Sequence, residues 1–124
     1  MEPVERPIRV LFICRYNRHR SATAERLFCK DPALEVTSAG TSSEALVPIN
    51  DRMLEWADVV FVMEPEHVRF LNEQFPANPA LRRVVNLDIP DQYSFLHPEL
   101  IALLQERVTP HLRRIAAEHR LTEE

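Results

Sequence analysis

The stretch from Val10 to Phe28 reads VLFICRYNRHRSATAERLF, and the rest of the chain is organised around it. Its first four residues are apolar, which is typical of a buried strand, and Cys14 ends that run. Five residues separate Cys14 from Arg20, and an amphipathic helical pattern begins at Ser21. The stretch therefore predicts a strand, a tight loop and a helix, with a thiol where the strand ends and a guanidinium where the helix begins.

A loop of this kind is suited to binding an anion. Backbone N–H groups that end at a helix N-terminus lack partners within the helix, and the helix dipole adds positive potential there. The same field favours the thiolate form of a cysteine at the floor of the loop, and the thiolate is the nucleophilic form. The spacing of Cys14 and Arg20 is a weak signal by itself, because arginine is abundant in this chain. Its context makes Cys14 a candidate nucleophile for phosphorus.

Other residues of the loop are candidates for holding a phosphate. Asn17 can adopt a left-handed backbone conformation and brace the loop, and the Ser21 hydroxyl can donate to the Cys14 sulfur. Arg20 can hold two phosphate oxygens in a bidentate grip that a lysine does not reproduce. His19 can add positive charge or simply face solvent. The predicted substrate-binding residues of the loop are Arg15, Tyr16, Asn17, Arg18, His19 and Ser21.

The composition indicates a small globular domain. The 124 residues fit one domain, 1–124, and its charged tail from 118 to 124 is expected to fray. A net charge of −4 argues against nucleic acid as a partner, and no apolar run approaches the roughly 18 residues of a membrane helix. The beginning of the chain, MEPVERPIRV, lacks the apolar core of a signal peptide. We therefore expect a cytoplasmic monomer that needs no membrane, metal or cofactor.

Strands and helices alternate along the chain. The sequence predicts strands over 8–13, 34–37, 59–63 and 84–87, and helices over 21–30, 51–56 and 65–74 and from 98 onward. Segment 75–83 is expected to be a loop, and Pro110 is expected to kink or split the last helix. Cys29 is expected to pack inside the first helix as a small apolar side chain. This alternation predicts an α/β fold of three layers, with helices on both faces of a four-stranded parallel sheet.

Parallel strands place all their carboxyl ends on one edge of the sheet, where ligands bind. Four polar features follow strand ends in this sequence, so we expect them to lie together: Cys14, Ser38, Glu64 and the segment from Asp88 to Tyr93. Gly40, the sole glycine, follows the second strand. It indicates either a positive φ or a close approach to another segment.

The C-x5-R-S pattern with Asn17 inside it, preceded by VLFI, resembles the low-molecular-weight protein tyrosine phosphatases. Three further segments resemble the family in the same order, so the resemblance covers most of the chain: VTSAGT (36–41), FVMEPEH (61–67) and IPDQY (89–93). It implies the flavodoxin-like strand order 2-1-3-4 and hydrolysis of phosphotyrosine or another aryl phosphate through a phosphocysteine. It also selects Asp91 rather than Asp88 as the general acid. Tyr93 would stack on the substrate at the pocket mouth, or else be partly buried in the core.

The sequence departs from the family at three places. His19 stands where many members have a second cysteine, so a protective disulfide is not expected, and Gln92 replaces the usual proline after the acid. The region 41–59 is short, which leaves tyrosine specificity less determined than phosphatase chemistry. Two alternatives remain open: a phosphate-binding regulator without turnover, and an arsenate reductase, which the lack of any cysteine after Cys29 disfavours.

Overall fold

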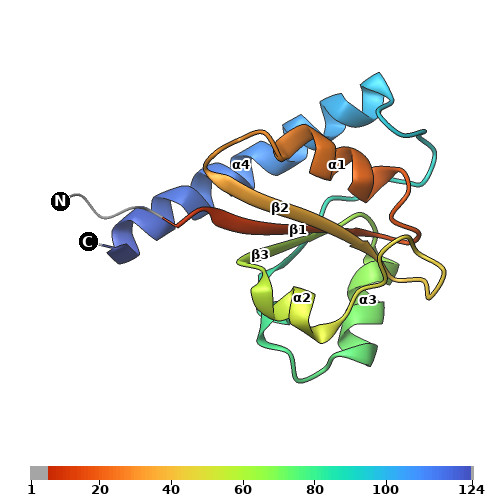
Figure 1. Ribbon diagram of the computed structural model, residues 1–124, viewed down its shortest axis with the longest axis horizontal. Helices are drawn as coiled ribbons and strands as arrows, with labels where there is room; N and C mark the ends of the chain where they lie inside the picture. Colours follow the sequence, from red (N-terminus) through yellow and green to blue (C-terminus); the bar gives the residue numbers. More distant parts are fainter. Residues whose placement is uncertain (1–5, 124) are drawn as a thin grey trace.

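The computed structural model describes residues 6–123, and in it four parallel strands lie between two layers of helices (Figure 1). The strands are β1 (Ile8–Cys14), β2 (Leu34–Gly40), β3 (Val59–Val62) and β4 (Val84–Asn86). The helices are α1 (Arg20–Phe28), α2 (Asp51–Trp56), α3 (Pro65–Gln74) and α4 (Pro98–Glu123), with a short 3-10 helix, η1 (Pro79–Arg83). The sheet order is β2-β1-β3-β4 with every pair parallel, so the predicted fold class is confirmed.

Each face of the sheet has its own core. Val10 and Phe12 of β1 face α1 and α4, while Leu11 and Ile13 face α2 and α3, and all four are fully buried. A strand covered on both faces is apolar at successive positions, as VLFI is. On the α1 and α4 side, the Phe12 ring stacks between those of Phe28 and Phe61, with ring centroids 5.7 and 5.4 Å away. The central strand thus fixes both helical layers.

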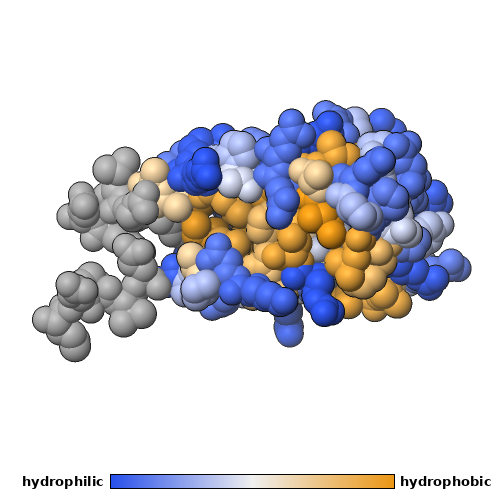
Figure 2. Space-filling model, turned by 90° about the horizontal axis from the view of Figure 1, so that it is seen from above, coloured by the Kyte–Doolittle hydropathy of each residue, from blue (hydrophilic) through white to orange (hydrophobic). Residues whose placement is uncertain are grey.

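The outer layer formed by α1 and α4 has a mixed surface. Figure 2, which looks onto this layer, shows charged and polar side chains over much of it, with hydrophobic side chains in a band between them. Several partly buried residues of the two helices pack against the core beneath: Leu27, Phe28, Leu103, Leu112 and Ala116. No helix within residues 6–123 is long and apolar enough to cross a membrane.

The first helix ends earlier than predicted. α1 stops at Phe28. The chain then turns, with a hydrogen bond from Leu34 N to Asp31 O over 3.0 Å, and continues into β2. Cys29 is therefore the C-cap residue and is exposed, so the prediction of a packed thiol inside the helix was wrong. Segment 75–83, expected as a loop, includes η1, whose N-cap Asn78 accepts a side-chain hydrogen bond from Ala80 N.

The last helix is continuous. α4 runs through Pro110 as a single element, so of the kink or split that the sequence predicted, the split does not occur. Proline removes one backbone donor, but Val108 before it and Ile115 after it are both buried against the sheet, so packing on either side holds the helix in place. The helix extends to Glu123 and so includes most of the tail for which fraying is predicted. Residue 124, the end of that predicted tail, lies outside the described residues.

Candidate active site

The parallel sheet brings the predicted residues to its carboxyl edge. Cys14 is the last residue of β1, the loop 15–19 follows, and Arg20 begins α1. On the neighbouring strand, Gly40 pairs with Cys14 and Ser38 pairs with Phe12. The end of β2 therefore lies directly beside the loop that follows β1, as the topology predicted.

Cys14 is buried and has one polar neighbour for its sulfur. The residue is 3% exposed, and its Sγ lies 3.0 Å from Ser21 Oγ in the first turn of α1. A hydroxyl at this distance can donate to a thiolate and so stabilise the anion. The contact between Ser21 and the sulfur that the sequence suggested is therefore present.

Asn17 braces the loop from inside. Its φ is 58°, the expected left-handed conformation, and its side chain is buried. Asn17 Nδ2 donates to Ser21 Oγ and to Ser38 Oγ, each over 2.8 Å, and Ser38 Oγ donates to Glu25 Oε1 over 2.9 Å. Glu25 is not among the residues predicted from the sequence. Its place one turn after Ser21, on the same face of α1, was the available signal.

Gly40 is required by close packing against the loop. Its φ is not in the left-handed region, so conformational freedom does not explain it. A Cβ at this position would lie 2.5 Å from Ala45 Cβ and 2.6 Å from the carbonyl oxygen of Arg15. Of the two predicted explanations, the close approach of another segment is the one observed. The missing side chain leaves room for the loop to fold against β2.

Arg20 links three segments of the carboxyl edge. Its side chain is only 3% exposed, and Nη1 donates to Glu64 Oε1 over 2.5 Å and to the Ile89 carbonyl over 2.8 Å. Its Nε lies 3.9 Å from Asp91 Oδ1. Nη2 makes no hydrogen bond with any residue that the structure describes. The sequence placed Glu64 at this edge, but it did not reveal the ion pair with Arg20.

The N-terminus of α3 supports this arginine. Glu64 precedes the helix, and burial would raise the pKa of its carboxyl, but a hydrogen bond with Glu66 and the Arg20 charge hold that pKa below its usual value. His67 Nδ1 accepts hydrogen bonds from Met63 N (3.3 Å) and Glu64 N (3.1 Å), so this nitrogen carries no proton. Burial, followed by the Arg20 charge, lowers the pKa of His67 to about 4. His67 is therefore neutral at pH 7.

The two aspartates after β4 differ in their surroundings. Asp88 has a φ of 53°, and its carboxylate accepts a hydrogen bond from Asn86 Nδ2 over 2.8 Å within its own turn. Asp91 is 52% exposed at the side chain and lies against Arg20. Only one of the two candidates for the acid is thus in contact with the buried arginine.

The remaining predicted residues surround this site at the surface. Arg15, Arg18 and His19 are exposed on the loop, and the Arg15 guanidinium lies 5.0 Å from the centroid of the Tyr16 ring. Tyr93 is half-buried, with its ring 5.7 Å from that of His97. Tyr93 packs against the hydrophobic core, so the partial burial that the sequence offered as one of its two roles is observed.

Hydrophobic side chains are exposed in two loops of this edge. Among the residues whose burial the structure describes, the large exposed hydrophobic ones are Leu46, Val47, Phe95 and Leu96. Leu46 N donates to the Tyr16 carbonyl over 3.1 Å, and Leu96 N donates to Thr23 Oγ1 over 2.9 Å, so both loops are tied to the Cys14–Arg20 segment or to the helix after it. These hydrogen bonds hold both apolar loops against the Cys14–Arg20 segment and α1.

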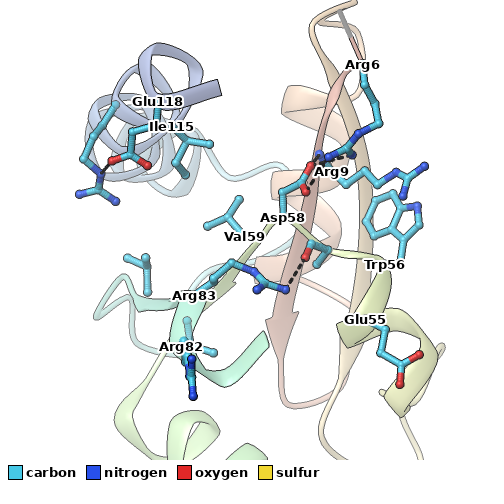
Figure 3. A pocket seen from close by; sticks show the side chains of 14 residues that line it. Arg6, Arg9, Glu55, Trp56, Asp58, Val59, Arg82, Arg83, Ile115 and Glu118 are labelled. Carbon is cyan, nitrogen blue, oxygen red and sulfur yellow. Dashed lines mark hydrogen bonds and ion pairs between the residues drawn. The ribbon is translucent and has the colours of Figure 1, made fainter. Parts of the chain in front are cut away.

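A separate cavity of about 730 Å³ lies at the opposite, amino edge of the sheet (Figure 3). Several arginines line it, and most have partners: Arg6 pairs with Asp58 at 3.0 Å, Arg114 with Glu118 at 3.9 Å, and Arg83 donates to the Ala57 carbonyl over 3.2 Å. Trp56 is half-buried on its wall, with the Arg9 guanidinium 6.0 Å from its ring. This cavity contains none of the predicted site residues.

The fold is that of the low-molecular-weight protein tyrosine phosphatases, so the resemblance seen in the sequence is confirmed. The tyrosine phosphatase Wzb from Escherichia coli K30, solved with phosphate, is 20% identical; the match covers 88% of this chain and 99% of that one, with a TM-score of 0.72. The arginine phosphatase YwlE from Geobacillus stearothermophilus is 24% identical over 91% and 97% of the two chains, with a TM-score of 0.66. A further protein tyrosine phosphatase is 25% identical over 88% and 96%, with a TM-score of 0.69.

No protein-family model and no curated protein matches the chain by its sequence.

Proposed function

We propose that this protein hydrolyses phosphate monoesters, with aryl phosphates such as phosphotyrosine as substrates, through a phosphocysteine on Cys14. One observation carries the proposal. The buried sulfur of Cys14 faces the Ser21 hydroxyl at 3.0 Å, on the loop that also supplies the buried Arg20 beside Asp91. A nucleophile, a guanidinium and a carboxyl group thus converge on one edge of the sheet. Transfer of a phosphoryl group through cysteine needs these three groups.

In the first step, the Cys14 thiolate attacks phosphorus in line with the leaving oxygen. The S–P bond forms as the P–O bond to the aryl group breaks, and the Asp91 carboxylic acid gives its proton to the departing oxygen. The loop amides and Arg20 hold the other phosphate oxygens. The products are a phosphocysteine and a neutral phenol.

In the second step, water attacks the phosphorus of the phosphocysteine. The Asp91 carboxylate takes a proton from this water, and the S–P bond breaks to release inorganic phosphate. The Ser21 hydroxyl, 3.0 Å from Sγ, can donate to the departing sulfur and stabilise it as a thiolate. The cycle returns both side chains to their initial protonation states and uses no redox partner.

The contacts of Arg20 suit a role in holding phosphate. Nη1 is occupied by Glu64 and by the Ile89 carbonyl, which fixes the position of the guanidinium. Among residues 6–123, the edge formed by Nε and Nη2 contacts Asp91 alone, at 3.9 Å. That edge is available for two parallel hydrogen bonds to phosphate oxygens, the geometry that guanidinium groups favour.

The surroundings of the site favour an aryl ester. Tyr16 on the loop and the half-buried Tyr93, two residues after Asp91, offer aromatic faces beside the proposed position of the phosphate. We further propose that the protein acts as a monomer in the cytoplasm, because a cysteine nucleophile must stay reduced. The fold shared with YwlE makes phosphoarginine the natural comparison substrate.

Two other functions make different demands on the chain. A phosphate-binding regulator would need Arg20 but no acid. An arsenate reductase would need further thiols near Cys14, and the second cysteine of the chain, Cys29, lies beyond the far end of α1, about 14 Å along a helix of nine residues. The position of Cys29 therefore opposes a thiol relay.

The test is hydrolysis of p-nitrophenyl phosphate under reducing conditions by wild type, Cys14→Ser and Cys29→Ser. We expect turnover by wild type and by Cys29→Ser, and none by Cys14→Ser, which should still bind inorganic phosphate. A wild-type protein that binds phosphate but does not turn over the ester would instead favour the regulator. Parallel assays with phosphotyrosine and phosphoarginine peptides distinguish the two substrate classes.

A further inference from the structure

We propose that Arg107 of α4 is a positioning residue for the Asp91 loop, and that it controls protonation of the leaving group without touching the substrate. This rests on the function proposed above for Asp91. Arg107 is half-buried in the middle of α4, and its Nη1 donates to the carbonyl of Leu87 over 2.8 Å and to that of Asp88 over 2.6 Å. These carbonyls belong to the segment that leads from β4 to Asp91.

Two arginines bind three consecutive carbonyl groups of this segment. Arg107 donates hydrogen bonds to the carbonyls of Leu87 and Asp88, and Arg20 donates one to the carbonyl of Ile89 over 2.8 Å. The two guanidiniums come from α4 and from the start of α1, so the segment is held from two helices at once. Hydrogen bonds from charged donors are roughly twice as strong as those between neutral groups. The acid loop is thus fixed at its base by charged groups.

The backbone of this segment needs such a partner. Leu87 N and Ile89 N donate to the carbonyls of Val62 and Met63, each over 2.8 Å, which extends the pairing of β4 with β3. Between them Asp88 adopts a φ of 53°, a conformation that is uncommon for a residue other than glycine. Aspartate adopts it more readily than most residues, and two hydrogen bonds with the Asn86 side chain support it here. Arg107 adds further support from α4, through its hydrogen bonds to the carbonyls of Leu87 and Asp88.

The contacts of Arg107 affect the position of Asp91, which lies three residues after Asp88. Pro90 lies between Ile89 and Asp91 and restricts the backbone, so a shift of the Asp88 carbonyl is transmitted to the acid rather than absorbed. A general acid must reach the leaving oxygen at hydrogen-bond distance. Loss of the Arg107 contacts should therefore impair proton transfer more than attack by the thiolate.

The experiment compares Arg107→Met with Arg113→Met. Both changes replace an arginine on α4, but Arg113 is exposed and makes no hydrogen bond or ion pair with the described residues. For each variant, kcat/KM is measured with phenyl phosphate, whose leaving group needs a proton, and with 2,4-dinitrophenyl phosphate, whose leaving group does not. We expect Arg107→Met to lose about tenfold or more with phenyl phosphate but less than about threefold with the dinitrophenyl ester. Arg113→Met should match wild type with both.

Two further measurements separate positioning from general stability. In an Asp91→Asn background, Arg107→Met should cause no additional loss with p-nitrophenyl phosphate, because it acts through Asp91. Amide hydrogen exchange of residues 88–93 should accelerate in Arg107→Met and not in Arg113→Met. Equal losses with both esters, additive losses in the double variant, or unchanged exchange would overturn the proposal. Failure of wild type to turn over any ester would overturn the proposed function instead, and exchange would still decide whether Arg107 holds the loop.

Discussion

At the scale of single residues, the site is organised around a buried arginine whose partners come from distant parts of the chain. Arg20 contacts Glu64, the Ile89 carbonyl and Asp91, which follow two other strands. A cation buried to this extent is tolerated only with such partners, because burial without them costs several kcal/mol. The same contacts orient the guanidinium for the proposed binding of phosphate.

Replacement of the proposed acid tests the assignment of the two aspartates. Asp91→Asn should lower kcat/KM for p-nitrophenyl phosphate by about 10²- to 10⁴-fold, because a positioned acid contributes that much. Phosphate binding should be retained, since the loop and Arg20 are unchanged. Asp88→Asn is the matched control, because the Asp88 carboxylate bonds only within its own turn. A large loss in Asp88→Asn with none in Asp91→Asn would reverse the assignment.

Removal of the carboxylate that pairs with Arg20 should reduce stability. Glu64→Ala leaves a buried guanidinium without one of its partners, so we expect the free energy of unfolding in urea to fall by about 1–3 kcal/mol. Glu73→Ala on the exposed face of α3 is the control, with an expected change within about 0.5 kcal/mol. Equal stability of Glu64→Ala and Glu73→Ala would show that this ion pair contributes little.

At the scale of secondary structure, strand ends and helix starts carry the site. Cys14 ends β1, Arg20 starts α1, and Glu64 precedes α3. Parallel connectivity alone brings such positions together, because right-handed crossovers place every strand's carboxyl end on one edge. The N-termini of α1 and α3 lie at this edge, and the first turn of a helix leaves backbone amides without partners inside the helix.

The buried histidine at the start of α3 makes stability depend on pH. The pKa of His67 is about 4 in the folded protein against 6.5 ordinarily, so the unfolded chain binds more protons between these values. The free energy of unfolding should therefore fall as pH decreases from 6.5 toward 4, by at most about 3 kcal/mol from His67. Above pH 6.5, His67 is neutral in both states and should not change the stability. Urea unfolding at pH 7 and pH 5 measures the effect.

A variant without the titrating ring isolates this contribution from that of the carboxylates. His67→Gln keeps a polar side chain but cannot gain a charge, so its stability should change less between pH 7 and pH 5 than that of wild type. His97→Gln, at a half-buried position before α4, serves as the control and should retain the wild-type dependence. Identical pH dependence of His67→Gln and wild type would contradict the account.

Local pattern was enough to predict most elements, and long-range contacts were not predictable. The apolar runs, Pro65 at the start of α3 and Asn50 as the cap of α2 follow from short stretches of sequence. The continuity of α4 through Pro110 depends on packing against the sheet, which a helix-breaking rule does not include. The positions of Cys14 and Ser38 at one edge follow from topology, but the hydrogen bonds of Glu64 and Arg107 join residues whose spacing has no pattern.

At the scale of the whole molecule, the two edges of the sheet differ in character. The carboxyl edge combines a buried nucleophile, a buried cation and apolar loop tips, whereas the cavity at the amino edge has arginines that mostly pair with acids or backbone carbonyls (Figure 3). α4 spans the molecule and covers one face of the sheet (Figure 1). The same helix therefore contributes to the hydrophobic core and, through Arg107, holds the segment that leads to Asp91.

The core beneath α4 should determine global stability. Leu104 is fully buried against the sheet, so Leu104→Ala should lower the free energy of unfolding by about 2–5 kcal/mol. Leu103→Ala, one position along the helix and only partly buried, should cost less. Thermal or urea unfolding of both variants measures the difference, and a larger loss in Leu103→Ala would mean that α4 packs in a different rotation.

The central claim is that Cys14 carries the phosphoryl group during turnover. The most direct measurement is rapid acid quenching of Asp91→Asn during reaction with 2,4-dinitrophenyl phosphate, followed by peptide mass spectrometry. This ester transfers its phosphoryl group without help from the acid, while hydrolysis of the intermediate is slowed, so the intermediate should accumulate. We predict phosphate on the peptide that contains Cys14 and none when Cys14 is replaced by alanine. Phosphate on another residue, or turnover with no phosphorylated cysteine, would contradict the account.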